Sequence, residues 1–163
     1  MTDVADQIEL RRLVDRYAIA IDRRDTATLA GLFVPDGGID VHLAGRPEPV
    51  ARLRGEAGMG RLVDALGIYA DTLHLVANFV PTVEDDTATA TTYCVAHHWF
   101  VSEEESFDER LYVVYDDRFL RTPDGWRFTV RGIRRRWTET TPAGQKPLQV
   151  DLELTGRRRP PGP

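Results

Sequence analysis

Apolar residues in the first half of the chain recur with a helical period. Residues 4–22 space them by three and four positions, as one buried face of a helix requires. Residues 26–33 predict a short second helix, which the turn-forming residues 35–38 would end. A third helix is predicted over residues 60–69, after a loop around residues 46–49.

The pattern then changes to the two-residue alternation of β-strands. A first strand is predicted at residues 39–43, and long β-rich stretches at residues 73–83, 87–101 and 110–137. A turn at residues 122–125 divides the last stretch into a hairpin. Helices followed by meandering strands predict an α+β fold, with helices packed on one face of a curved antiparallel sheet. The segment from Thr138 is expected to form an arm or to fray.

The composition is that of one ordinary globular domain. A chain of 163 residues is long enough for a real core, and its 42% hydrophobic and 29% charged residues are typical of soluble proteins. A net charge of -5 argues against a nucleic-acid or anionic-membrane surface. Neither a signal peptide nor an apolar run of about 20 residues is visible, so we expect a cytoplasmic protein.

Several common chemistries have no support in the sequence. The lone Cys94 excludes an internal disulfide and a multi-cysteine metal site. Ser102 and Ser106, the only serines, lie in an acidic stretch without a nucleophile elbow, and Lys146, the only lysine, lies in a loop-like segment. The glycine motifs that hold dinucleotides or triphosphates are missing. We therefore expect no cofactor.

Asp22 and His74 are the best candidates for an acid/base pair. Asp22 closes the first helix near its buried face, and His74 stands in an apolar run. A carboxylate that holds one imidazole nitrogen leaves the other free to take a proton near neutral pH. Alternatively, His74 is a core histidine bonded to a backbone carbonyl, and Asp22 ends its helix beside Arg23 or Arg24.

The adjacent histidines His97 and His98 lie in the stretch 87–101, where neighbours point to opposite faces. His98 falls on a face of small side chains that would leave room for a ligand, so we favour it, unless a bulge leaves both histidines partly exposed. That face consists of Ala88, Ala90, Thr92, Cys94, Ala96 and His98. Asp22, His74 and His98 would make a metal site of two histidines and one carboxylate, a ligand set that proteins use. Their spacing in the sequence matches no recognised metal motif, so we expect no metal site.

Four short motifs occur in a characteristic order: Arg16-Tyr17 with Asp22, Leu32-Phe33 before Pro35-Asp36-Gly37, Thr72-x-His74, and Asp124-Gly125-Trp126-Arg127-Phe128. From residue 8 to residue 137 the chain resembles the SnoaL-like branch of the nuclear-transport-factor-2-like superfamily. That branch includes scytalone dehydratase, bile-acid dehydratases, a dehydrochlorinase and polyketide cyclases, besides members without enzymatic activity. The resemblance implies a cone-shaped α+β barrel, in which three helices wrap a strongly bent sheet around an apolar pocket. The domain would span residues 1–140, and residues 141–163 would be a C-terminal arm or disordered tail.

The resemblance also implies site residues. The Asp–His dyad of the dehydratases falls on Asp22 and His74, with the histidine as base and the aspartate orienting it. The tyrosine of the bile-acid dehydratases falls on Tyr17, and the second histidine of scytalone dehydratase has its counterpart in His98. Scytalone dehydratase carries a tyrosine directly before its aspartate, where this chain has Ile21, which argues against close kinship to that enzyme.

The last-strand arginine of other relatives falls on Arg131 or Arg135, where it would hold an anionic group or a developing enolate. Strict alternation puts Phe128 and Val130 on the face opposite Arg131. A bulge near Gly132 is therefore needed if both kinds of residue point inward. The run of three arginines at 134–136 is equally compatible with a solvated edge.

The resulting hypothesis is a cofactor-independent lyase, or a cyclase or isomerase, acting on a small hydrophobic hydroxylated or polycyclic substrate. We expect an apolar pocket lined by Ile21, Leu29, Phe33, Leu62, Leu66, Phe79 and Phe100. A homodimer is expected through an outer patch of Tyr93, Val95, Trp99 and Tyr112. Two alternatives stay open: a binding or assembly module without activity, and an epoxide hydrolase, for which a second inward carboxylate is not found. Steroid isomerisation lacks a carboxylate on the inner face of residues 87–101.

Overall fold

The computed structural model describes residues 4–43, 45–103 and 105–143. Its helices are α1 (Val4–Asp22), α2 (Thr26–Gly31), α3 (Gly55–Ala65) and the 3₁₀ turn η1 (Leu66–Ile68). Its strands are β1 (Phe33–His42), β2 (Ala51–Arg54), β3 (Asp71–Glu84), β4 (Thr87–Ser102), β5 (Glu105–Thr122) and β6 (Gly125–Pro142). They form one sheet in the order β2-β1-β6-β5-β4-β3, and only β1 and β6 run parallel.

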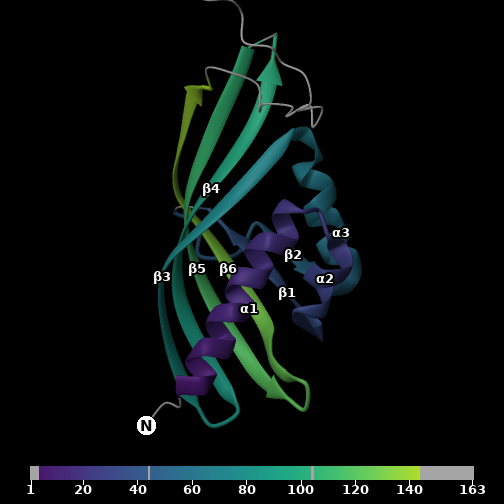
Figure 1. Cartoon of the computed structure of the whole chain (residues 1–163), viewed down its shortest axis with the longest axis vertical. Coiled ribbons are helices and arrows are strands. Elements are labelled where there is room, and N and C mark those ends of the chain that lie inside the picture. The colour runs from purple at the N-terminus through teal and green to yellow at the C-terminus, as the bar shows by residue number, and fades with distance from the viewer. Residues whose placement is uncertain (1–3, 44, 104, 144–163) are drawn as a thin grey trace, which may run out of the picture.

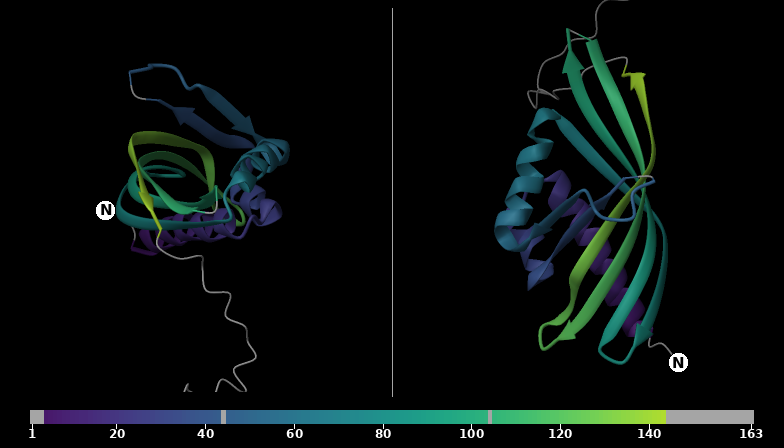
Figure 2. Two further views of the ribbon diagram at one scale, coloured as in Figure 1. Left: turned by 90° about the horizontal axis from the view of Figure 1, so that it is seen from above. Right: turned by 180° about the vertical axis from the view of Figure 1, so that it is seen from behind.

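The sheet curls around the helices, as Figures 1 and 2 show. In Figure 1, α1 runs across the lower half of the sheet and α3 stands beside its upper half. The helical period of the first segment explains the position of α1, because its apolar stripe of Leu10, Leu13, Val14, Tyr17 and Ile21 is buried against the strands. The predicted α+β fold, with three helices on a strongly curved and mainly antiparallel sheet, is confirmed.

Several element boundaries differ from the prediction. The residues 35–38, predicted as a turn, lie inside β1, and the short strand β2 was not predicted. A Cβ on Gly38 would lie 1.9 Å from the carbonyl oxygen of Leu53, so this glycine permits the close pairing of β1 with β2. α2 ends two residues early and α3 begins five residues early, relative to the predicted ranges 26–33 and 60–69.

The predicted fraying from Thr138 is wrong. Residues 138–142 continue β6 and pair with residues 107–111 of β5, because the second half of that long hairpin supplies their backbone hydrogen bonds. The part of the predicted tail from residue 144 onward lies outside the described residues.

The inner face of β4 has the predicted composition. Its residues Ala88, Ala90, Thr92, Cys94, Ala96 and His98 are each at most 5% exposed. β4 pairs with β5 without a register shift, so alternation holds over its whole length. His98 therefore points inward, and His97 lies on the outer face, where it contacts Asp108.

A bulge in β6 brings an arginine into the interior. Phe128 pairs with Phe119 and Val130 pairs with Arg118, which leaves Thr129 as the extra residue. Phe128 and Arg131 are in consequence both completely buried. The predicted bulge exists, three residues before the expected position near Gly132.

The outer face of the sheet carries the predicted aromatic residues. Tyr112 stacks on Trp137 with ring centroids 4.5 Å apart. Tyr93 and Trp137 are 52% and 54% exposed, and a hollow of about 440 Å³ lies between them with Val95 on its wall. This surface is a contiguous apolar patch of the kind that proteins usually cover.

Among the described residues, no helix combines the length and the apolar character that crossing a membrane demands.

Candidate active site

Asp22 and His74 meet where the end of α1 reaches β3. The Asp22 carboxylate accepts hydrogen bonds from His74 Nδ1 at 2.6 Å, from the His74 backbone N–H at 2.9 Å and from the Thr72 hydroxyl at 3.0 Å. The side chains of Asp22 and His74 are only 18% and 9% exposed. The structure thus brings together the two residues predicted to form an acid/base pair.

These contacts decide which nitrogen of His74 is basic. Burial works against ionisation of Asp22, but hydrogen bonds from the side chain and backbone of His74 outweigh it and lower the pKa of the carboxyl group. An ionised carboxylate only accepts hydrogen bonds, so Nδ1 of His74 carries the proton. Nε2 then has the free lone pair, and no described residue hydrogen-bonds to it.

Arg24 supports this pair through hydrogen bonds at the end of α1. Its backbone adopts φ 56°, which ends α1 and turns the guanidinium back over the helix terminus. Nη1 donates to the Ile21 carbonyl at 2.9 Å and to the Thr72 hydroxyl at 2.6 Å. Since Thr72 in turn donates to Asp22, the arginine fixes the orientation of the carboxylate through one intermediate.

His98 faces the dyad from β4. Its ring centroid lies 5.8 Å from that of His74 and 4.5 Å from that of Tyr69. The side chain is buried, yet neither ring nitrogen has a hydrogen-bond partner within the described residues. Buried polar groups are normally satisfied, so these nitrogens indicate a place for a ligand or an ordered water. Burial, aided by the neighbouring His74, lowers the pKa of His98 to about 4, so its ring is neutral at pH 7.

Tyr69 and Glu109 adjoin His98 on the side away from the dyad. Glu109 is the direct cross-strand partner of His98, and its Oε2 accepts a hydrogen bond from the Tyr69 hydroxyl at 2.6 Å. Burial and the Glu109 carboxylate raise the pKa of Tyr69 to about 12, so the tyrosine remains a donor. The site therefore contains a second carboxylate at its outer end.

Arg131 and Asp117 form a sealed ion pair below the dyad. Nε and Nη2 of Arg131 donate to the two oxygens of Asp117 at 2.9 and 2.7 Å, and both side chains are 0% exposed. The guanidinium carbon lies 4.1 Å from the ring centre of Tyr17, 4.2 Å from that of Tyr115 and 4.5 Å from that of Phe128. Burial raises the pKa of Tyr17 to about 12. The structure thus brings the predicted site residues Tyr17 and Arg131 into contact with each other.

Comparison with known proteins shows the family to which the chain belongs. The sequence profile of the SnoaL-like domain matches residues 2–132. The chain belongs to the SnoaL-like family. An uncharacterised protein of Mycobacterium tuberculosis is 31% identical over 134 residues, which cover 80% of this chain and 86% of the relative.

Two solved structures share the fold of this SnoaL-like chain. A protein of Novosphingobium aromaticivorans, provisionally named a scytalone dehydratase, aligns with a TM-score of 0.70 and 23% identity, covering 88% of this chain and 91% of that one. The hexachlorocyclohexane dehydrochlorinase LinA-type3 of Novosphingobium barchaimii aligns with a TM-score of 0.69 and 19% identity, covering 86% and 92%.

Three further predicted residues lie at the upper end of the sheet, beside the dyad. The carbonyl of Leu66 accepts a hydrogen bond from Arg24 Nη2 at 3.4 Å. Phe100 lies with its ring centroid 6.2 Å from that of Tyr69. Arg135, the alternative to Arg131, pairs with the inward Val113 next to a register shift and is exposed to solvent.

The other apolar residues predicted to line the pocket belong to the packed core. Ile21 and Phe33 are 1% and 6% exposed, and Phe33 stacks on Phe128 with ring centroids 5.0 Å apart. Phe79 lies beside Ile8 under the N-terminal half of α1. The lower half of the inner face is therefore filled by side chains, and a substrate would have to bind at the upper half.

The sequence analysis missed four residues that the SnoaL-like chain places at these two sites: Thr72, Tyr69, Glu109 and Asp117. The view that no second carboxylate points inward is wrong, because Asp117 alternates with the buried Tyr115 and Phe119 along β5. That alternation was the available signal. For Glu109, the signal was the tight connection between β4 and β5, which pairs it with His98. The buried Asp117 gives no support to an epoxide hydrolase, since Arg131 seals it from water.

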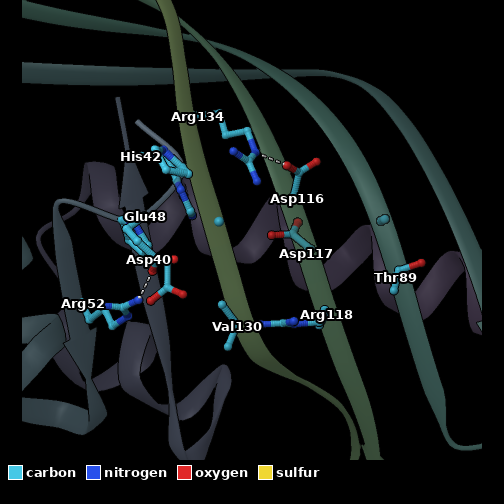
Figure 3. A pocket seen from close by; sticks show the side chains of 14 residues that line it. Asp40, His42, Glu48, Arg52, Thr89, Asp116, Asp117, Arg118, Val130 and Arg134 are labelled. Atoms are coloured by element: carbon cyan, nitrogen blue, oxygen red, sulfur yellow. Dashed lines mark hydrogen bonds and ion pairs between the residues drawn. The ribbon is translucent and has the colours of Figure 1, made fainter. Parts of the chain in front are cut away.

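The described residues contain no group of three or more histidine, cysteine, aspartate or glutamate side chains able to hold a metal ion. A separate hollow of about 420 Å³ lies on the outer face, between the β1–β2 hairpin and strands β5 and β6 (Figure 3). Arg134 pairs there with Asp116, and Arg52 with Glu48 at 2.9 Å. The sheet separates this hollow from the dyad. In the hollow, each of these two arginines is neutralised by the carboxylate with which it pairs.

Removing one partner of the sealed ion pair should be severely destabilising. We expect Asp117→Ala to lower the free energy of unfolding by about 3–5 kcal/mol, because it leaves the Arg131 charge buried and unpaired. The double variant Asp117→Leu with Arg131→Met should recover most of that loss. Urea denaturation measures both, and a single variant as stable as the wild type would contradict the buried pairing.

The depressed pKa of His98 makes stability depend on pH. The unfolded chain binds a proton on this residue below about pH 6.5, whereas the folded chain does so only near pH 4, so stability falls as the pH drops through that window. Between pH 7 and pH 5 the wild type should lose about 1–2 kcal/mol more than His98→Gln. Thermal or urea unfolding at the two pH values tests this, and equal losses would show that His98 is not buried neutral.

Proposed function

We propose that this SnoaL-like chain is a cofactor-independent lyase that eliminates water from a small hydrophobic, hydroxylated substrate. The observation that carries the proposal is the Asp22–His74 contact of 2.6 Å, which leaves Nε2 on the inner face without a partner among the described residues. An imidazole held in this way can take a proton from a substrate at Nε2.

The reaction would begin at Nε2 of His74, which takes a proton from a carbon next to an activating group. The electrons of that C–H bond form the new double bond, and the neighbouring C–O bond breaks with its electron pair on oxygen. His98 donates a hydrogen bond to this oxygen, and the proton held by His74 completes the departing water. The sum is redox-neutral and regenerates both histidines.

Asp22 would act through His74. Its negative charge stabilises the imidazolium that forms, and the hydrogen bond that it accepts from Nδ1 holds the ring in one tautomer and one orientation. Arg24 and Thr72 keep the carboxylate itself in place. These four residues form one continuous hydrogen-bonded unit between α1 and β3.

The relatives support elimination as the reaction type. One protein with this fold is provisionally named a dehydratase and another is named a dehydrochlorinase, and both names denote an elimination, of water in one case and of hydrogen chloride in the other. Ring closure or isomerisation would use the same first step, with the carbanion reacting differently. The apolar surroundings favour a hydrophobic substrate, since Phe100 and Phe107 stack at the upper end of the sheet with ring centroids 5.4 Å apart.

Exchanging the base should abolish turnover without unfolding the protein. We expect His74→Gln to lower kcat by about 10³-fold or more, because the proton acceptor is lost. Asp22→Asn should be nearly as damaging, because the amide carries no charge to offset an imidazolium. The readout is product formation from a panel of hydroxylated polycyclic compounds, with Asp15→Asn, on the same helix and paired with Arg11, as control.

Two results would decide against the proposal. Turnover by His74→Gln at the wild-type rate would reject the mechanism. Absence of any elimination, cyclisation or isomerisation product from the wild type, combined with tight binding of the same compounds, would identify a binding module instead.

We also propose that the protein is a homodimer through the aromatic patch on the outer face of the sheet. The stacked pair of Tyr112 and Trp137, together with the half-exposed Tyr93, offers an apolar surface too large to leave in water. A two-fold axis through this face would bury it against itself, which gives each protomer the same contacts.

A charge in the patch should separate the protomers. We expect the wild type to sediment as a dimer at micromolar concentration and Trp137→Glu to sediment as a monomer, because a buried carboxylate without a partner opposes association. Ile68→Glu, at a site 76% exposed on η1, should leave the dimer intact. A wild type that is monomeric at micromolar concentration would contradict the proposal.

A further inference from the structure

We propose that Glu109, held by Tyr69, binds a hydroxyl group of the substrate beside His98, so that the site selects substrates with a hydrogen-bond-donating hydroxyl at this position. This inference rests on the proposed function, because it assigns the substrate of the same site. It concerns recognition, and it is tested by binding rather than by turnover.

The register of the sheet places Glu109 at the dyad's end of the molecule. Thr72, His98 and Glu109 pair with one another in turn across β3, β4 and β5, and His74 lies one inward position below Thr72. Residues directly opposite on one face of an antiparallel pair have Cβ atoms about 5 Å apart. Glu109 is therefore next to His98 and on the same inner face as His74.

Tyr69 fixes the glutamate in that position. Its hydroxyl donates to Oε2 at 2.6 Å, and its ring lies 4.5 Å from that of His98. The segment that carries Tyr69 is itself anchored, because its backbone N–H bonds to the Leu66 carbonyl at 3.0 Å and that of Ala70 bonds to the Trp99 carbonyl at 2.9 Å. A carboxylate held this way loses little rotamer freedom on binding a ligand.

Glu109 has acceptor capacity to spare. A carboxylate offers about four lone-pair sites on two oxygens. The Tyr69 hydroxyl occupies one of them, and no residue of the described ranges donates to Oε1. Both ring nitrogens of the neighbouring His98 are buried and unpartnered as well. The Glu109 carboxylate, an acceptor, and the neutral imidazole of His98 thus lie side by side. A substrate hydroxyl could donate a hydrogen bond to Glu109 and accept one from the N–H of His98.

The surrounding charges argue against an anionic ligand. The Glu109 carboxylate would repel it, and the interior cation Arg131 is sealed under three aromatic rings and bound at two nitrogens to Asp117. Arg24 is engaged with the backbone of α1 and with Thr72. Arg135, whose charge acts to lower the pKa of Tyr69, is exposed to solvent, where water weakens its attraction for an anion. No metal-ion cluster exists among the described side chains. A neutral ligand with a hydroxyl group is what the remaining acceptor fits.

The test compares two probes of nearly equal shape, 2-naphthol and 2-methoxynaphthalene, by calorimetric titration. The wild type should bind 2-naphthol roughly tenfold more tightly, as a hydrogen bond to a charged acceptor predicts. In Glu109→Leu the two affinities should become equal. Tyr69→Phe should shrink the preference to a few-fold, because the carboxylate loses its anchor. Glu139→Leu, which removes the similar Tyr112–Glu139 pair at 3.1 Å on the outer face, should leave the preference unchanged.

The outcomes separate this inference from the proposed function. His74→Gln should retain the hydroxyl preference whether or not the wild type turns over any compound. Equal binding of the two probes by the wild type, or an undiminished preference in Glu109→Leu, would overturn the subsite. Tighter binding of the ammonium probe 2-(aminomethyl)naphthalene than of 2-naphthol would overturn the assignment to a hydroxyl.

Discussion

The Asp22 carboxylate is the constraint on which the candidate site depends. It accepts three hydrogen bonds from β3, two of them from His74, and so ties the end of α1 to the strand that carries the base. A carboxylate at the C-terminal end of a helix opposes the macrodipole, so this placement is unfavourable for the helix alone. The bonds from β3 offset that penalty and at the same time set the tautomer of His74. Stability and chemistry therefore share one group.

The inner face of the sheet is divided into a half filled by packed side chains and a half that carries the dyad, His98 and Glu109. Below the dyad, aromatic rings enclose the Arg131–Asp117 ion pair, and nothing is exposed. Above it, no described residue hydrogen-bonds to the ring nitrogens of His98 or to Oε1 of Glu109. This division bears on Arg131, for which the sequence resemblance predicts contact with an anionic group. Its side chain and that of Asp117 are 0% exposed, whereas His98, Tyr69 and Glu109 lie on the dyad's side of the inner face.

Much of this arrangement follows from periodicity. The alternation along β4 identified the inward histidine, because no bulge interrupts that strand, and the helical spacing of α1 placed Asp22 near the core. The parts that the sequence did not reveal depend on pairing between distant segments. Asp117 points inward by the alternation along β5, but its partner Arg131 faces it only because of the bulge at Thr129, and Glu109 meets Tyr69 only through the pairing of the strands. Residues 35–38 resemble a turn, yet their glycines serve close strand pairing.

The tautomer of His74 tests the central claim most directly. Two-dimensional NMR correlating the ring nitrogens with the carbon-bound ring protons distinguishes a protonated from a bare nitrogen in each histidine, and His74→Gln assigns the signals. For the neutral ring the account predicts that His74 carries its proton on Nδ1 with Nε2 bare, and that Asp22→Asn removes this preference. A ring protonated on Nε2 alone, in the wild type, would contradict the orientation of the base by Asp22.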